Sequence, residues 1–126
     1  MIIGIDFDGT VVEHRYPKVG AHNPGAIDVM RKLVTAGHEL ILWTMRSGKE
    51  LQDAVDYFGT WGIPLFGANE NPEQRGWTES PKVYCQIYID DAALGCPLVR
   101  GNTGIRPMVD WGVVEQMLID RGLINE

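Results

Sequence analysis

Residues 2–10 read IIGIDFDGT and join a run of apolar, mostly β-branched side chains to an abrupt acidic end. An uninterrupted apolar run of this kind is typical of a central parallel strand that is buried on both faces. Asp6 ends the run, and Asp8 follows two positions later. Gly9 lets the chain turn, so both carboxylates can point into one cavity. The stretch therefore predicts the first strand and a polar site at its carboxyl end.

Two helices and two further strands are predicted before residue 67. Asn23 and Pro24 suit the N-cap and the first helical position, and apolar residues at helical spacing follow them up to Gly37. Ser47 and Glu50 form a capping box, which predicts the start of the second helix. Apolar runs predict strands at residues 40–43 and 63–66.

The second half predicts a long loop, two short strands and a last helix. Residues 67–81 lack periodicity and carry several asparagines, glycines and prolines, which is typical of a loop. Strands are expected at 87–89 and 98–99, and a last amphipathic helix from 113 to 119, closed by Gly122. This order predicts an α/β fold: a Rossmann-like, mostly parallel sheet flanked by helices.

The composition fits one globular domain. The chain has 126 residues, of which 44% are hydrophobic and 22% charged, and domains commonly run about 100–150 residues. We therefore expect a single domain over residues 1–126. Residues 11–22, between the first strand and the first helix, are too few to form a sizeable inserted domain. No apolar run approaches the roughly 18 residues of a membrane helix, and no signal peptide is visible, so we expect a cytoplasmic protein with no membrane partner.

The acidic balance excludes one class of partner and favours a cation. The net charge of −6 does not suit a nucleic-acid binder, because phosphate neutralisation needs clustered lysines and arginines. Several carboxylates in one cleft would repel an anionic substrate unless a divalent cation lies between them. Cys85 and Cys96 lack the spacing of a zinc site, and we expect them to be core side chains.

Polar residues follow three predicted strands at the point where each ends. Asp6 and Asp8 follow the first, Thr44 the second, and Asp90 with Asp91 the fourth. Ligands of open parallel sheets bind at the carboxyl ends of the strands, so we expect these side chains to meet. One carboxylate can attack phosphorus while a second moves the proton. Mg²⁺ prefers hard oxygen ligands, which the acidic pairs supply.

Residues after the second strand are candidate substrate contacts. Ser47 opens a predicted helix whose backbone N–H groups favour an anion, and the Thr44 hydroxyl adds a donor. Arg46 can bind a phosphate or a substrate carboxylate with two parallel hydrogen bonds.

In this order, the motifs resemble those of the haloacid dehalogenase (HAD) superfamily of phosphohydrolases, in its small capless form. They are Asp6-x-Asp8-Gly9-Thr10, Thr44, Lys82 and Asp90-Asp91. The resemblance implies that Asp6 is a nucleophile, which becomes an aspartyl phosphate, and that Asp8 is the general acid/base. It also implies that Thr44 and Lys82 hold the transferring phosphoryl group. The implied reaction is Mg²⁺-dependent hydrolysis of a small phosphorylated metabolite, such as a sugar phosphate or a nucleotide.

The resemblance also implies a ligand set for Mg²⁺. It consists of the carboxylates of Asp6 and Asp90, the backbone carbonyl of Asp8, and Asp91 through water. Lys82 departs from the usual pattern, because it lies only eight positions before Asp90. If residues 83–89 were fully extended, the two would lie roughly 25 Å apart. Lys82 therefore serves only if residues 83–85 fold back, and Lys49 is the substitute.

Loop residues are candidates for specificity and for covering the open site. Trp77 is a candidate cover, whereas His14 and His22 are better explained as solvated loop residues. The residues to test for specificity are His14, Arg15, Arg75 and Trp77. The tryptophans expected either to pack within the monomer or to cover the site of a second copy in a homo-oligomer are Trp61, Trp77 and Trp111.

Two other functions stay open at this point. A receiver-like signalling module, phosphorylated on aspartate, also uses Asp, Thr and Lys at strand ends, but its phospho-acceptor Asp would follow the third strand, where Asn69 stands. A non-catalytic phosphate-binding domain would keep the fold, but a degenerate site would usually have lost Asp6 or Asp8.

Overall fold

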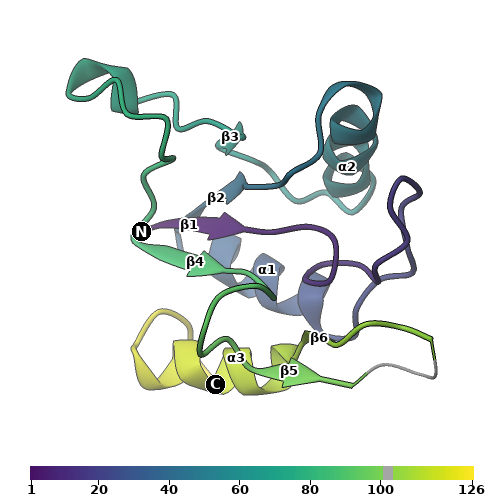
Figure 1. Ribbon diagram of the computed structural model, residues 1–126. Coiled ribbons are helices and arrows are strands. Elements are labelled where there is room, and N and C mark those ends of the chain that lie inside the picture. Colours follow the sequence, from purple (N-terminus) through teal and green to yellow (C-terminus); the bar gives the residue numbers. More distant parts are fainter. Residues whose placement is uncertain (101–103) are drawn as a thin grey trace.

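A computed structural model of the chain describes residues 1–100 and 104–126. Its centre is a four-stranded parallel sheet with the strand order β3-β2-β1-β4 (Figure 1). The predicted α/β fold with a mostly parallel sheet is thus confirmed. The strands are β1 (Ile2–Ile5), β2 (Glu39–Leu42), β3 (Gly67–Ala68) and β4 (Ile87–Ile89).

The hydrogen-bond ladder continues past the carboxyl ends of the strands. The Asp6 N–H donates to the carbonyl of Ile89, at 3.0 Å. The Trp43 N–H donates to Ile5, at 2.8 Å, and the Asn69 N–H to Leu42, at 2.7 Å. The four strands therefore end level with one another, and the residues that follow them meet at one edge of the sheet.

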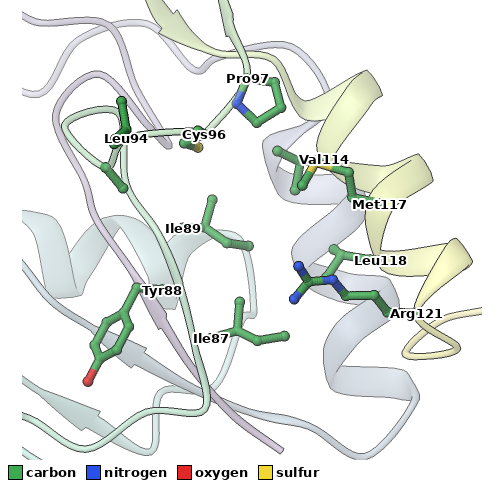
Figure 2. Close-up of a pocket in the computed structure, with 12 residues that line it drawn as sticks. Ile87, Tyr88, Ile89, Leu94, Cys96, Pro97, Val114, Met117, Leu118 and Arg121 are labelled. Carbon is green, nitrogen blue, oxygen red and sulfur yellow. The ribbon is translucent and has the colours of Figure 1, made fainter.

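All three helices belong to the main hydrophobic core, which lies on one face of the sheet. Ile3 and Ile5 of β1 alternate with Gly4, and both are fully buried in that core. In β4, Ile89 points toward α3, whereas Tyr88 points to the opposite side (Figure 2). The helices are α1 (Ala26–Thr35), α2 (Gly48–Thr60) and α3 (Trp111–Asp120).

The opposite face of the sheet is covered by a connection that contains no α-helix. Val83 and Cys85 pack there against Ile41 in a second, smaller core cluster. The connection includes a short 3-10 helix, η1 (Gln74–Gly76), within the predicted loop. The buried Gln74 side chain donates to the carbonyl of Lys82, at 2.7 Å, and so ties the loop to the segment before β4.

The start of α1 differs from the prediction. The helix begins at Ala26, after Gly25 in a left-handed conformation (φ 87°). Asn23 is therefore not the N-cap. Its buried side chain donates to the carbonyls of Thr10 (3.0 Å) and Val109 (2.7 Å). It thereby joins the turn after β1 to the segment before α3.

Two more local predictions fail for identifiable reasons. Ser47 is the N-cap of α2, as predicted, but its side chain makes no capping hydrogen bond, so the box with Glu50 does not form. The third strand is β3 rather than residues 63–66, because the N–H of Ile63 still bonds to Phe58 and closes α2 (2.9 Å). Pairing with β2 begins only at Phe66, whose N–H donates to Leu40.

The predicted strand at 98–99 exists but lies outside the main sheet. It forms β5 (Leu98–Val99), which pairs antiparallel with β6 (Met108–Val109), a strand that the sequence did not predict. The last helix starts at Trp111, two residues earlier than predicted, with Asp110 as its N-cap. Trp111 is buried within this chain. Among the described residues, 1–100 and 104–126, no helix has the length and apolarity to cross a membrane.

Candidate active site

The turn after β1 is fixed by the carbonyl of Phe7. It accepts hydrogen bonds from the N–H groups of Thr10 (3.1 Å) and Val11 (2.8 Å), so the chain reverses directly beyond the strand. Gly9 adopts a positive φ of 83° in this turn. A Cβ at Gly9 would collide with the side chains of His14 and Asp91. The glycine is thus required by both the backbone conformation and the close packing around it.

Three carboxylates meet at the edge where β1 and β4 end. Asp6, Asp90 and Asp91 each place one oxygen within 4.8 Å of the others, and all three are partly buried. Burial, followed by the neighbouring Asp91 and Asp90, raises the pKa of Asp6 to about 8. The pKa of Asp90 is also raised, mainly by burial and then by Asp91. The structure therefore brings together three of the four predicted acidic residues.

Thr10 joins the two halves of this cluster. Its buried hydroxyl donates to Oδ2 of Asp6 at 2.8 Å and accepts the N–H of Asp91 at 3.1 Å. The Thr10 carbonyl accepts the indole N–H of Trp111 at 2.7 Å. Thr10 belongs to the first sequence motif, but the sequence alone did not indicate this bridging role.

His14 belongs to the site rather than to solvent. Its side chain is 16% exposed, and Nε2 lies 2.8 Å from Oδ2 of Asp91. The expectation of a solvated loop histidine is therefore wrong for His14. The residue comes to Asp91 because the chain reverses after residue 12, where Val12 bridges to His22 and Glu13 donates to Ala21.

Asp8 points to a different partner from the other three acids. Both of its oxygens accept hydrogen bonds from the guanidinium of Arg46, each at 2.8 Å. The carboxylate is therefore not part of the three-carboxylate cluster. A metal role for Asp8 through its backbone carbonyl stays a prediction.

Arg46 does not have the predicted role of contacting substrate. Its side chain is 1% exposed. Nε and Nη2 bind Asp8, and the remaining N–H groups donate to the carbonyls of Pro17, Lys18 and Glu50. These five hydrogen bonds use all five guanidinium donors, so none is left for a bound molecule.

Thr44 lies at the end of β2, as predicted, in a turn held by Asn69. The Thr44 N–H donates to Oδ1 of Asn69 at 2.8 Å, and Asn69 Nδ2 donates to the carbonyl of Arg46 at 3.2 Å. The Thr44 hydroxyl accepts the N–H of Arg46 at 3.2 Å, so its own hydrogen is free to turn toward an anion. Ser47 is exposed at the start of α2. Sequence reasoning missed Asn69; its signal is a polar residue directly after β3.

The two candidate lysines have different surroundings. The hydroxyl of Tyr88 donates to the carbonyl of Val83, and the Cys85 N–H donates to that hydroxyl. Residues 83–85 therefore fold back over the sheet, as a phosphoryl-binding role for Lys82 requires. The Nζ atom of Lys82 lies 5.9 Å from the Tyr88 ring centroid. Lys49 is exposed on α2 and pairs with Asp53 at 3.0 Å.

Trp77 is not brought to the strand ends. It is 65% exposed and packs edge-to-face on Tyr84, with ring centroids 5.5 Å apart. Tyr84 precedes Gln86, whose N–H bonds to Ile2 at the amino end of β1. The loop around η1 thus lies toward the amino ends of the strands (Figure 1), and Trp77 does not cover the carboxylates.

A separate cavity of about 240 Å³ lies between β4 and α3 (Figure 2). Its walls are mostly apolar side chains, such as those of Ile89, Val114 and Leu118, and Arg121 also lines it. Among the described residues that line it there is no carboxylate, so its chemistry differs from that of the strand-end cluster.

The three-carboxylate cluster suits a hard divalent cation. It offers carboxylate oxygens, which Mg²⁺ prefers. Within residues 1–100 and 104–126, no lysine or arginine forms an ion pair with Asp6 or Asp90. The mutual repulsion that contributes to the raised pKa of Asp6 is what a cation between the carboxylates would relieve. Asp6, Asp90 and Asp91 are therefore the residues that would hold it.

Fold and site together define a small α/β protein with a carboxylate cluster at the carboxyl edge of a parallel sheet. The chain is similar to a conserved protein coded by a locus from Bacteroides thetaiotaomicron, whose solved structure matches with a TM-score of 0.80 and 32% identity. The match covers 96% of this chain and 91% of that one, and the chain belongs to the same family as that protein. No family model and no curated protein matches the chain. The description of that protein names no activity.

Proposed function

We propose that this protein is a Mg²⁺-dependent phosphatase that hydrolyses a phosphomonoester through an aspartyl phosphate on Asp6. The proposal is supported above all by the position of Asp6, at the end of the central strand and within 4.8 Å of Asp90 and Asp91. Ligands of such sheets bind at this edge. The order of the motifs, which resembles that of the HAD superfamily, supports the same reaction.

In the first step, a carboxylate oxygen of Asp6 attacks phosphorus. The bond from phosphorus to the leaving oxygen breaks, and Asp8, which starts the step protonated, gives that oxygen its proton. In the second step, water attacks phosphorus and passes a proton to Asp8. The bond between Asp6 and phosphorus then breaks, inorganic phosphate leaves, and both side chains return to their starting state.

The remaining groups serve to bind and orient the phosphoryl group. Mg²⁺ on the three carboxylates would supply the positive charge that allows an anion to approach Asp6. Thr44 offers a hydroxyl, and the residues around Ser47 offer N–H groups at the start of α2. Lys82 offers a flexible positive charge. The substrate class that fits these donors is a small phosphorylated metabolite.

The experiment measures phosphate release from a panel of sugar phosphates, nucleotides and p-nitrophenyl phosphate, with Mg²⁺ and with EDTA. Wild type should release phosphate only with Mg²⁺. Asp6→Asn should lose at least about 1,000-fold in rate, because the amide is a far weaker nucleophile. Asp28→Asn, on the exposed side of α1, is the matched control and should keep wild-type activity.

Release that persists in Asp6→Asn, or that ignores EDTA, would contradict the proposal. Absence of release from every compound would also count against it and would favour a phosphate-binding role.

A further inference from the structure

The guanidinium of Arg46 links Asp8 to a loop that has no helix or strand of its own. It gives two hydrogen bonds to the Asp8 carboxylate and one each to the carbonyls of Pro17 (3.2 Å) and Lys18 (2.7 Å). The fifth bond goes to the carbonyl of Glu50 in α2, at 3.2 Å. One side chain thus fixes three segments of the chain to one another.

Packing holds this guanidinium in place. It lies over the ring of Phe7, with its central carbon 5.1 Å from the ring centroid, and 5.2 Å from that of Tyr16. The Arg46 side chain is 1% exposed, whereas that of Asp8 is 17% exposed. The arginine is therefore buried, while Asp8 keeps some contact with solvent.

We propose that Arg46 is the positioning residue for proton transfer by Asp8; this rests on the phosphatase function proposed above. A bidentate pair fixes the position and the plane of a carboxylate, which one hydrogen bond does not. Each carboxylate oxygen has a second lone pair. These remaining lone pairs let Asp8 take up and release a proton while the pair with Arg46 stays intact. Arg46 acts only through Asp8, because no donor remains for a substrate.

The same hydrogen bonds set where the loop lies. Pro17 and Lys18 bind the guanidinium that holds Asp8, so a displacement of Arg46 moves the loop and the carboxylate together. Lysine cannot replace this arrangement, because an ammonium group has three donors on one nitrogen and no planar fork.

Proton transfer to the leaving group makes a distinctive kinetic prediction. A poor leaving group, such as the phenolate of phenyl phosphate, needs a proton from Asp8, whereas p-nitrophenolate leaves almost unaided. The quantity kcat/KM reports on attack by Asp6, the step in which that proton moves. Loss of Asp8 positioning should therefore reduce kcat/KM far more for phenyl phosphate than for p-nitrophenyl phosphate.

The test measures kcat/KM across substituted aryl phosphates for wild type, Arg46→Gln, Arg46→Lys, Asp8→Asn and the double variant Asp8→Asn/Arg46→Gln. We expect Arg46→Gln to lose about 100-fold on phenyl phosphate and less than about 10-fold on p-nitrophenyl phosphate, in the range of general acid catalysis. In the Asp8→Asn background, Arg46→Gln should cost less than about threefold, because the two residues act as one unit. Arg31→Gln is the matched control, since Arg31 also donates to a carbonyl and lies over a tryptophan ring, but on α1.

Equal losses on all leaving groups, or additive losses in the double variant, would overturn the inference. Thermal unfolding of each variant shows whether it folds. If neither Arg46 variant folds, Tyr16→Leu decides, because Tyr16 stacks on the guanidinium yet is exposed. A steeper dependence on the leaving group in that variant supports the inference, and an unchanged one overturns it. If Asp6→Asn is active, the proposed function itself fails. If Asp6→Asn is inactive but the Arg46 variants leave the dependence of kcat/KM on the leaving group unchanged, only the role of Arg46 fails.

Discussion

The imidazole Nε2 of His14 lies 2.8 Å from Oδ2 of Asp91, and 77 positions separate the two residues in the chain. Asp91 also offers an oxygen to the cluster with Asp6 and Asp90. A hydrogen bond from a neighbouring side chain commonly orients a metal-binding carboxylate. His14 is therefore placed to fix Asp91 within the proposed cation site.

The first prediction concerns His14 and the response to Mg²⁺. His14→Ala should raise the Mg²⁺ concentration at half-maximal activity about 10-fold or more, because an unsupported Asp91 is a poorer ligand. His14→Gln should recover most of this loss, since its Nε2 can reach a similar position and donate. The measurement is a Mg²⁺ titration of phosphate release. Equal Mg²⁺ requirements of the Ala and Gln variants would argue against this role of His14. The control is His22→Ala, because His22 is an exposed histidine.

The second prediction concerns pH and stability without metal. Burial and the neighbouring acids raise the pKa of Asp6 from 3.8 to about 8. This group therefore contributes most to stability below pH 3.8, and the contribution is lost as pH rises through about 8. In EDTA, the contribution of Asp6 to the melting temperature should therefore fall as pH rises from 3.8 to about 8. Comparison with Asp6→Asn removes the effect of the other titrating groups.

Mg²⁺ should reverse this trend, because it competes with the proton for the same carboxylates. The increase in melting temperature on adding Mg²⁺ should therefore grow with pH between 4 and 8. Asp6→Asn carries no charge at this position and should flatten both effects. A Mg²⁺-induced increase that is constant across this range would contradict the assignment of Asp6 to the cation site.

The sequence predicted the acidic cluster well, because it depends on strand ends alone. Asp6 and Asp90 each follow an unbroken apolar run, and parallel strands in register bring such ends together. The contacts of Arg46 with residues 17 and 18 and of His14 with Asp91 were not predictable in this way. Both depend on how residues 13–20 fold back, and that short loop has no periodic pattern to predict its course.

The predicted start of α1 was wrong because the Asn23 side chain bonds to residues outside the helix. Asn23 has the ordinary signature of an N-cap, yet it bonds to Thr10 and Val109, which lie far from α1 in sequence. Local propensity cannot anticipate such a partner. β6 was missed because a strand of two residues has no alternation to detect.

The third prediction concerns the hydroxyl of Thr10. Thr10→Val keeps the shape of the side chain but removes the donor to Asp6 and the acceptor for the Asp91 N–H. We expect a loss of about 1–3 kcal/mol in the free energy of unfolding, because a buried group is left without its partner. Thr10→Ser keeps the hydroxyl and should lose only about 1 kcal/mol, for the missing methyl group. Urea unfolding measures both, and equal losses would contradict the bridging role.

The fourth prediction separates the two lysines. Lys82 extends from a segment that folds back over the sheet, and its Nζ lies 5.9 Å from the Tyr88 ring centroid. Lys49 is exposed and pairs with Asp53 at 3.0 Å. If Lys82 holds the phosphoryl group, Lys82→Met should reduce kcat/KM about 100-fold, the usual effect of losing one charged transition-state donor, whereas Lys49→Met should change it less than about twofold. The two variants remove the same charge, so net charge cannot explain a difference between them. A larger loss in Lys49→Met would assign the phosphoryl group to the start of α2 instead.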